Sequence, residues 1–193
     1  MYPRTKPYTG YTTKMQNNLP NLTQNLHLKM HPDTRGTFTE LYRQEWDTSI
    51  TPIQWNLVQS NTNVLRGVHV HIKHWDYLII SSGSAIVGLR DLRRNSPTFE
   101  QTVMIKQTGE QLSALIIPPG VAHGFYFLEP STHIYAVSEY WNMQDELGCH
   151  WNDPALEMDF TVQQPMLSAR DSSAKPFALL MQQLEPLQKS FVY

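Results

Sequence analysis

The stretch Asn63-Val64-Leu65-Arg66-Gly67-Val68-His69-Val70-His71 decides how the rest of the chain is interpreted. Side chains alternate along a β-strand, so His69 and His71 are expected to share one face. Val68 and Val70 would then share the opposite, apolar face. Two imidazoles pointing the same way from a strand are typical of a proton-transfer site or a metal site.

Composition restricts the class of protein. The chain has 193 residues, of which 40% are hydrophobic and 11% aromatic, enough for one domain with a sizeable core. A net charge of −2 and a pI near 6.4 argue against a nucleic-acid or membrane-surface partner. No run approaches the roughly 18 apolar residues that a membrane span requires. We read no export signal either and expect a cytoplasmic protein. The single cysteine, Cys149, is expected to be an inert thiol.

The arrangement of strand and turn signals predicts an all-β fold. Turn signals recur about every 8–12 residues between residues 30 and 140, without a convincing amphipathic helix, as in a β-sandwich or barrel. The predicted strands cover residues 37–42, 53–61, 102–105, 111–117, 126–128 and 134–138, and a hairpin over 77–92 turns at Ser82-Gly83. Residues 1–25 have the polar, proline-containing composition of an extended arm, and a helix is predicted from Pro176 to about Gln188.

Histidines dominate the candidate chemistry. His69, His71 and the His123 of a Pro-x-Gly-x-x-His segment resemble a cupin metal site, since two strands could bring three imidazoles together. Asp76 could supply a carboxylate ligand to such a site. Tyr135 and Asp171 form a further polar constellation. We assign no function to the other histidines considered, which are His74, His133 and His150.

Several segments, read together, resemble the dTDP-4-dehydrorhamnose 3,5-epimerase family of nucleotide-sugar epimerases. They are Asp33–Glu40, Gln59-Ser60-Asn61, Val64–His69, Asp91–Phe99, Ile117–Phe125, Tyr135, Trp151-Asn152-Asp153-Pro154 and Leu167–Asp171. The resemblance covers roughly residues 27 to 175, in the order that the family shows. It implies a cupin-type double-stranded β-helix, or jelly roll, over residues 26–175, with an arm over 1–25 and a short helical tail over 176–193. It also implies a homodimer and catalysis without metal or cofactor.

The same resemblance implies catalytic roles. His69 matches the family's general base, oriented and charge-balanced by Asp171. Tyr135 matches the acid on the opposite face of the sugar, and His123 matches a further active-site histidine. The implied substrate-binding positions are Arg66, Gln59 and Asn61 for the diphosphate and sugar, Arg35 and Glu40 on a strand that contributes to the neighbouring subunit's site, and Trp141 for stacking on the nucleobase.

The chemistry of a 4-keto sugar suits these residue types. The C–H bonds on both carbons beside the ketone are acidified, so a base can remove a proton to give an enolate. A histidine with a pKa near 6.5 is matched to this task, and a paired carboxylate stabilises the imidazolium that forms. A tyrosine hydroxyl can return a proton from the other face, which inverts the centre.

The sequence departs from the family pattern beside the base. Asp76 stands where the family has a lysine associated with the enolate oxygen, and Val87 stands where it has an aspartate. The glutamine usual two residues after the base is His71 here. An anion would oppose the developing enolate, so we expect His71, if protonated, to be the substitute donor, followed by Lys73.

We therefore expect a homodimeric epimerase that inverts C3 and/or C5 of a nucleoside-diphosphate 4-keto-6-deoxyhexose in deoxysugar and polysaccharide biosynthesis. Two alternatives remain open from the sequence. One is a metal-dependent cupin enzyme that uses His69, His71 and His123. The other is a catalytically degenerate protein that binds a sugar nucleotide without turning it over.

Overall fold

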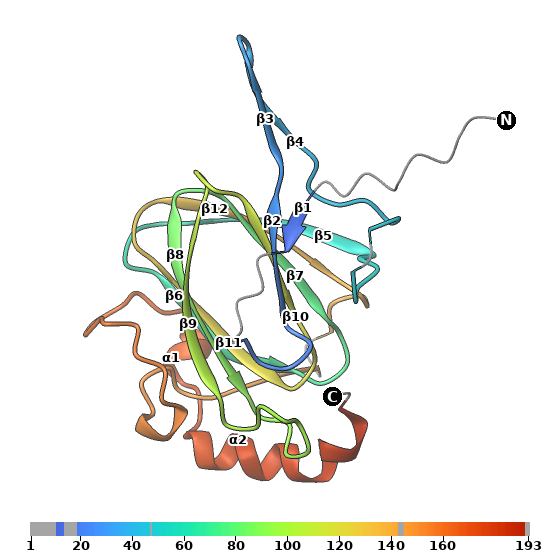
Figure 1. The fold of residues 1–193 in the computed structure, drawn as a ribbon. Helices are drawn as coiled ribbons and strands as arrows, with labels where there is room; N and C mark the ends of the chain where they lie inside the picture. The colour runs from blue at the N-terminus through green and yellow to red at the C-terminus, as the bar shows by residue number, and fades with distance from the viewer. Residues whose placement is uncertain (1–10, 14–18, 47, 143–144, 192–193) are drawn as a thin grey trace, which may run out of the picture.

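A computed structural model describes residues 11–13, 19–46, 48–142 and 145–191 and confirms the all-β prediction. Two antiparallel sheets face each other as a jelly roll (Figure 1). The six-stranded sheet has the order β1-β2-β10-β7-β12-β5. Its strands are β1 (Tyr11–Thr13), β2 (Gln24–Leu28), β10 (Ser113–Ile117), β7 (Asp76–Ser82), β12 (Ser131–Val137) and β5 (Gln54–Ser60).

The five-stranded sheet carries the stretch around His69. It has the order β13-β6-β11-β8-β9, and its strands are β13 (Glu146–Gly148), β6 (Leu65–His71), β11 (Val121–Phe127), β8 (Ser84–Asp91) and β9 (Thr102–Thr108). β6 pairs with β11 in a register that sets His69 opposite His123. Strand pairing alone therefore brings together histidines that are distant in the sequence.

A separate two-stranded hairpin leaves the body of the fold. β3 (Met30–Asp33) and β4 (Gly36–Thr39) pair only with each other and project away from the two sheets (Figure 1). The strand predicted over residues 37–42 is thus shorter and starts one residue earlier. The hairpin predicted around Ser82-Gly83 is confirmed, because β7 ends at Ser82 and β8 begins at Ser84.

Apolar side chains fill the space between the sheets and cover both outer faces. The inner core joins the two sheets through residues such as Leu78, Leu89 and Leu115. On the outer side of the five-stranded sheet, Val68 and Val70 pack with residues of the C-terminal segment. The alternation predicted for β6 is therefore correct: its valines face this outer core, while His69 and His71 face the interior of the jelly roll.

The C-terminal segment is more structured than predicted. The predicted helix over 176–188 consists of α2 (Phe177–Leu184) followed by the 3₁₀ helix η3 (Glu185–Ser190). Two short elements were not predicted, the 3₁₀ helix η2 (Pro154–Leu156) and α1 (Ala169–Ser172). Both depend on side-chain caps, since Asp153 and Ser168 accept hydrogen bonds from backbone N–H groups of the first turn.

Residues 1–10 and 14–18 of the predicted arm lie outside the described residues. The boundaries given above for the arm, the jelly roll and the tail stay predictions.

Burial, and secondarily the charge of Asp153, raises the pKa of the Cys149 thiol to about 12. The side chain is fully buried, as expected of an inert thiol. Among the described residues, no helix has the length and apolar character needed to cross a membrane.

Candidate active site

A cavity of about 450 Å³ opens between the two sheets. Side chains from both sheets and from the segment before α1 line it. They include Val58 from β5, Arg66, His69 and His71 from β6, Asp76 and Leu78 from β7, His123 and Phe125 from β11, His133 and Tyr135 from β12, and Trp141, Glu146, Met166, Ser168, Arg170 and Asp171. All five residues predicted to be catalytic therefore line one cavity.

His69 and Asp171 form the closest polar pair of the predicted catalytic set. Nε2 of His69 lies 2.7 Å from Oδ1 of Asp171, and the Gly67 N–H donates to Oδ2 at 3.4 Å. The carboxylate is 7% exposed and the imidazole 22% exposed, so the histidine lies on the solvent side. With Nε2 bound to the carboxylate, Nδ1 remains to exchange a proton with a ligand in the cavity.

The charge of Asp171 follows from its surroundings. Burial alone would raise the pKa of its carboxyl, but the hydrogen bond and the charge of His69, with the Gly67 N–H, hold that pKa below its ordinary value. The group is therefore an anion at neutral pH. An anionic partner orients the ring of His69 and stabilises its protonated form, as a general base requires.

Gly67 permits the close approach of β6 to β11. Its φ is +109°, and a Cβ built there would lie 2.8 Å from the carbonyl oxygen of His123. Both properties exclude a larger side chain without backbone movement. The glycine of the opening stretch thus fixes the position of His69 relative to its neighbours.

Replacing Gly67 by alanine should destabilise the protein more than replacing Gly36 does. Gly36 also has a positive φ, +140°, but nothing lies within 4 Å of a Cβ built there. Each substitution should cost about 1–3 kcal/mol of unfolding free energy from backbone strain, and Gly67→Ala should add the cost of the backbone contact. Urea unfolding at matched protein concentration measures the difference, and equal losses in the two variants would contradict this role of Gly67.

Tyr135 faces the cavity from the sheet opposite His69. It lies on β12 of the six-stranded sheet, whereas His69 lies on β6 of the five-stranded one. Burial, followed by the charges of Asp76 and Glu146, raises the pKa of the Tyr135 hydroxyl. Tyr135 consequently keeps its proton at neutral pH and can act as an acid.

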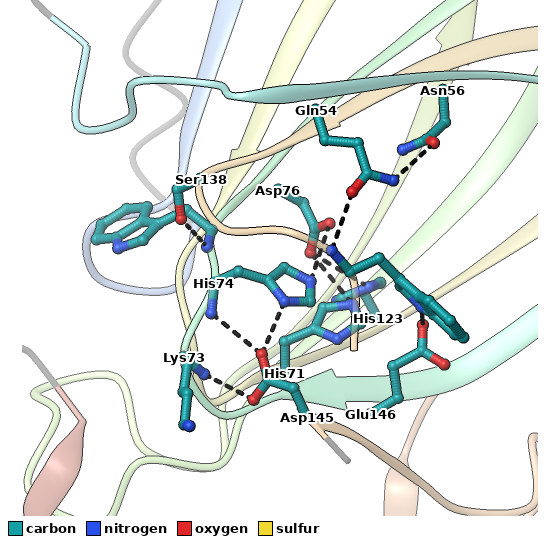
Figure 2. Close-up of polar contacts among 12 residues, drawn as sticks. Gln54, Asn56, His71, Lys73, His74, Asp76, His123, Ser138, Asp145 and Glu146 are labelled. Atoms are coloured by element: carbon teal, nitrogen blue, oxygen red, sulfur yellow. Dashed lines mark hydrogen bonds and ion pairs between the residues drawn. The ribbon is translucent and has the colours of Figure 1, made fainter. Parts of the chain in front are cut away.

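A second polar cluster, which we call the His/Asp cluster, comprises His71, His74, His123 and Asp76 (Figure 2). All four side chains are buried. Burial, followed by the charges of Glu146 and Asp145, raises the pKa of Asp76 well above its ordinary value. Asp76 therefore loses its proton less readily than an exposed aspartate, which weakens the expectation that it is an anion beside the substrate.

Two of the three histidines around Asp76, His71 and His123, are uncharged at neutral pH. Burial, followed by the neighbouring histidines, lowers the pKa of His71 well below its ordinary value. Burial likewise lowers the pKa of His123 to about 3. His71 can thus donate only as a neutral imidazole, whereas the sequence led us to expect donation from the protonated ring.

Two histidines that had been given no function line the cavity, namely His74 and His133. His74 lies between β6 and β7, where no strand alternation indicates a direction, and its Nδ1 is 2.7 Å from Asp145. His69, by contrast, lies outside the His/Asp cluster because its Nε2 is held by Asp171. The candidate metal ligands are thus His71, His74, His123 and Asp76, and His69 is not among them.

The predicted substrate-binding residues fall into two groups. Arg66 and Trp141 line the cavity; Arg66 donates from Nε to Ser60 at 3.0 Å, and Trp141 donates from Nε1 to Glu146 at 2.8 Å. Glu146 also pairs with Arg170, and neither of these two had been predicted. No motif in the sequence marks Glu146, whereas Arg170 lies in the segment that also carries Asp171.

The second group lies outside the cavity of its own chain. The side chains of Gln59 and Asn61 are exposed, and Gln59 contributes a backbone carbonyl to Arg66. Arg35 extends from the β3–β4 hairpin, is 88% exposed and pairs with Asp33. Glu40 pairs with Arg43. The binding roles predicted for these four residues stay predictions.

The fold and this site define a jelly-roll protein in which a histidine–carboxylate pair faces a tyrosine across a cavity. Comparison with known proteins then specifies the family. The profile of the dTDP-4-dehydrorhamnose 3,5-epimerase family matches residues 18–178. The chain belongs to this family, a family of isomerases, and the resemblance found in the sequence is confirmed.

Individual relatives agree with this assignment. The chain is 35% identical over 155 residues to a dTDP-4-dehydrorhamnose 3,5-epimerase of Pseudomonas aeruginosa, covering 76% of this chain and 86% of the relative. It is 31% identical over 140 residues to the spore coat polysaccharide biosynthesis protein SpsL of Bacillus subtilis, covering 70% and 93%. A solved dTDP-6-deoxy-D-glucose-3,5-epimerase of Legionella pneumophila, in complex with dTDP-4-keto-L-rhamnose, is 29% identical, with a TM-score of 0.78 and coverage of 84% and 92%.

Proposed function

We propose that this protein is an epimerase that inverts C3 and/or C5 of a nucleoside-diphosphate 4-keto-6-deoxyhexose in deoxysugar biosynthesis. The observation that carries the proposal is the His69–Asp171 pair, which faces Tyr135 across the cavity. Family membership supports the substrate class, since the relatives are named for 3,5-epimerisation of dTDP sugars.

The residues suggest an order of proton transfers. His69 removes the proton beside the ketone, and Asp171 stabilises the imidazolium that results. The electrons move onto the ketone oxygen, giving an enolate. Tyr135 then supplies a proton to the carbon from the opposite side, because it belongs to the opposite sheet. The centre is inverted, and solvent returns both residues to their starting protonation.

The enolate oxygen needs a donor in addition to these two groups, because acid–base catalysis alone is typically worth about 10²–10⁴-fold. The neutral N–H of His71 is a candidate, since His71 lines the cavity on the same strand face as His69. Protonated Asp76 is a second candidate. His123 has its Nδ1 occupied by the Val121 carbonyl at 3.1 Å, so only its Nε2 can face a ligand or Asp76.

Proton exchange in heavy water tests the proposal directly. A 4-keto-6-deoxy nucleotide sugar is incubated with the protein in D₂O, and deuterium at C3 and C5 is followed by NMR. We expect exchange at one or both carbons, which also reports which centres are inverted. Binding of the sugar nucleotide without exchange at either carbon would instead support a catalytically degenerate binding protein.

The binding residues suggest how the nucleotide is held. Arg66 offers a guanidinium at the cavity wall, suited to a diphosphate oxygen. Trp141 offers an indole face for stacking on the base, and 44% of its surface is exposed. Gln59, Asn61, Arg35 and Glu40 would complete the site from outside the cavity.

We propose further that the protein is a homodimer whose subunits share these sites. Large apolar side chains are exposed on the face of β5 that points away from the cavity (Trp55 and Leu57), just before β5 (Ile53) and on the β3–β4 hairpin (Phe38). An exposed apolar patch of this kind marks an interface more often than free surface. A cytoplasmic location stays a prediction.

Mixing two inactive variants should restore activity if Arg35 acts in the neighbouring subunit. In a mixed dimer of His69→Ala and Arg35→Ala chains, the Arg35→Ala subunit keeps its own His69 and receives Arg35 from its partner. An equal mixture should regain roughly a quarter of wild-type activity, because half the dimers are mixed and each holds one complete site. The exchange rate is measured below the KM after the subunits have been unfolded and refolded together.

The control is each variant unfolded and refolded alone. Activity of the mixture no higher than the mean of the two variants would show that Arg35 acts within its own chain. Light scattering gives the mass of each species, so a failure to form dimers is seen separately.

A further inference from the structure

The His/Asp cluster places three imidazoles around one buried carboxylate (Figure 2). Nε2 of His71 lies 3.4 Å from Oδ2 of Asp76, and Nε2 of His123 lies 3.7 Å from the same atom. Nε2 of His74 lies 3.7 Å from Oδ1. We propose that His71, His74, His123 and Asp76 bind a divalent transition-metal ion, with Zn²⁺ as the ion that this donor set fits.

These distances suit ligands of a common ion better than hydrogen bonds. An N–H···O bond typically spans about 2.7–3.2 Å, and all three contacts are longer. Nitrogen and oxygen donors lie about 2.0–2.2 Å from Zn²⁺, so two ligands of a tetrahedral ion lie roughly 3.4 Å apart. The donor atoms of His71, His74 and Asp76 all lie within 4.8 Å of one another.

The other ring nitrogens of two histidines are already fixed. Nδ1 of His74 lies 2.7 Å from Oδ2 of Asp145, whose Oδ1 accepts backbone N–H bonds from Ile72 and Lys73. Nδ1 of His123 donates to the Val121 carbonyl at 3.1 Å. Nδ1 of each ring is thus engaged, which leaves Nε2 to face Asp76. A carboxylate or carbonyl holding the far nitrogen is the usual support of a metal-binding histidine.

The cluster also contains polar atoms that lack partners. Oδ2 of Asp76 and Nδ1 of His71 are buried and make no hydrogen bond with any described residue. Asp76 is 7% exposed and His71 is 6% exposed, so bulk water does not solvate them freely. Buried polar groups are normally satisfied, and a cation between Asp76 and the three imidazoles would satisfy this carboxylate.

The donor set restricts the ion. Three imidazoles and one carboxylate suit zinc and other first-row transition metals, whereas magnesium and calcium prefer oxygen ligands. His71, His74 and Asp76 have their donor atoms within 4.8 Å of one another, and His123, whose Nε2 lies 3.7 Å from Asp76, is the candidate for the fourth position of tetrahedral zinc. The site departs from the metal-free enzyme that the family resemblance implies, and it includes Asp76, where the family pattern has a lysine.

A dication here would return positive charge to the cavity wall. The four cluster residues and His69 line the same cavity, so an enolate oxygen formed there would lie near the ion. This consequence rests on the proposed function, whereas metal binding itself does not.

Metal content and cobalt spectroscopy test the site. Tag-free protein made in zinc-supplemented medium is dialysed and analysed by mass spectrometry of its elements, and stoichiometric zinc is expected. The protein is then stripped with a chelator and titrated with Co²⁺. We expect intense visible absorption typical of tetrahedral Co²⁺, saturating at the same stoichiometry. If wild-type protein shows neither stoichiometric zinc nor the Co²⁺ absorption, the proposal is overturned. This conclusion does not depend on whether any variant folds.

His74→Gln and Asp76→Asn should both lose the cobalt spectrum, whereas the surface variant His150→Gln should keep it. Equal cobalt uptake by Asp76→Asn and wild type would also overturn the site. Circular dichroism confirms folding of each variant, and zinc should raise the thermal midpoint of wild type and of His150→Gln only.

Heavy-water exchange is measured in parallel. Zinc without exchange counts against the epimerase alone, whereas exchange without metal uptake counts against the metal site alone.

Discussion

Replacing His69 by asparagine should reduce deuterium exchange into a 4-keto sugar nucleotide by about 10²–10⁴-fold, the usual worth of a positioned general base. Asparagine keeps a polar group near Asp171 but cannot take up a proton. The exposed fraction of His69 is modest, and its valine neighbours hold the strand in the outer core, so the fold should persist. The rate is followed by NMR at saturating substrate.

His150→Asn is the matched control for this substitution. His150 bonds to Asn152 and does not line the cavity. Its variant should exchange protons at the wild-type rate. Calorimetric titration with dTDP should give similar Kd values for wild type and His69→Asn, because His69 is assigned to the sugar and not to the nucleotide. A His69→Asn variant as fast as wild type would remove His69 from the role of base.

Replacing Tyr135 by phenylalanine should separate exchange from inversion. Without the hydroxyl, the enolate can still form at His69, and the imidazolium can return a deuteron from the face it attacked. We expect deuterium to enter the substrate while its configuration is retained, and the epimer to form about 10²–10⁴-fold more slowly. NMR distinguishes deuterated substrate from deuterated epimer within one sample.

Tyr140→Phe serves as the control, because Tyr140 is 75% exposed and does not line the cavity. It should make the epimer at the wild-type rate. Undiminished epimer formation by Tyr135→Phe would assign the second proton to another group. Loss of exchange together with loss of the epimer would show that Tyr135 also assists formation of the enolate.

The sequence was sufficient for the parts of the site that lie on regular strands. His69 and His71 face the interior because β6 alternates, and the pairing of β11 with β6 sets His123 opposite His69. The family motifs located Asp171, and the structure places that carboxylate against His69. Local pattern and motif are enough where a residue's direction follows from its position in a strand or where a family motif names its partner.

Sequence reasoning failed where tertiary burial determines chemistry. Asp76 was read as an anion, yet its environment favours the protonated form. His74 received no function because a single histidine among eight is a weak signal, and its direction depends on Asp145, far along the chain. Glu146 had no motif at all. These properties arise from packing between segments, which neither periodicity nor spacing records.

The pairing of His69 with Asp171 has a consequence for biosynthesis. The two residues are 102 positions apart. The segment before α1 is joined to the start of β6 by two backbone hydrogen bonds: the Met166 N–H donates to the Asn63 carbonyl, and the Leu65 N–H donates to the Met166 carbonyl. During translation, the strand bearing the base emerges from the ribosome long before its carboxylate partner. The nascent chain therefore lacks the complete proton-abstracting pair until synthesis has passed residue 171, and a chain that stops before that point has the base without its carboxylate.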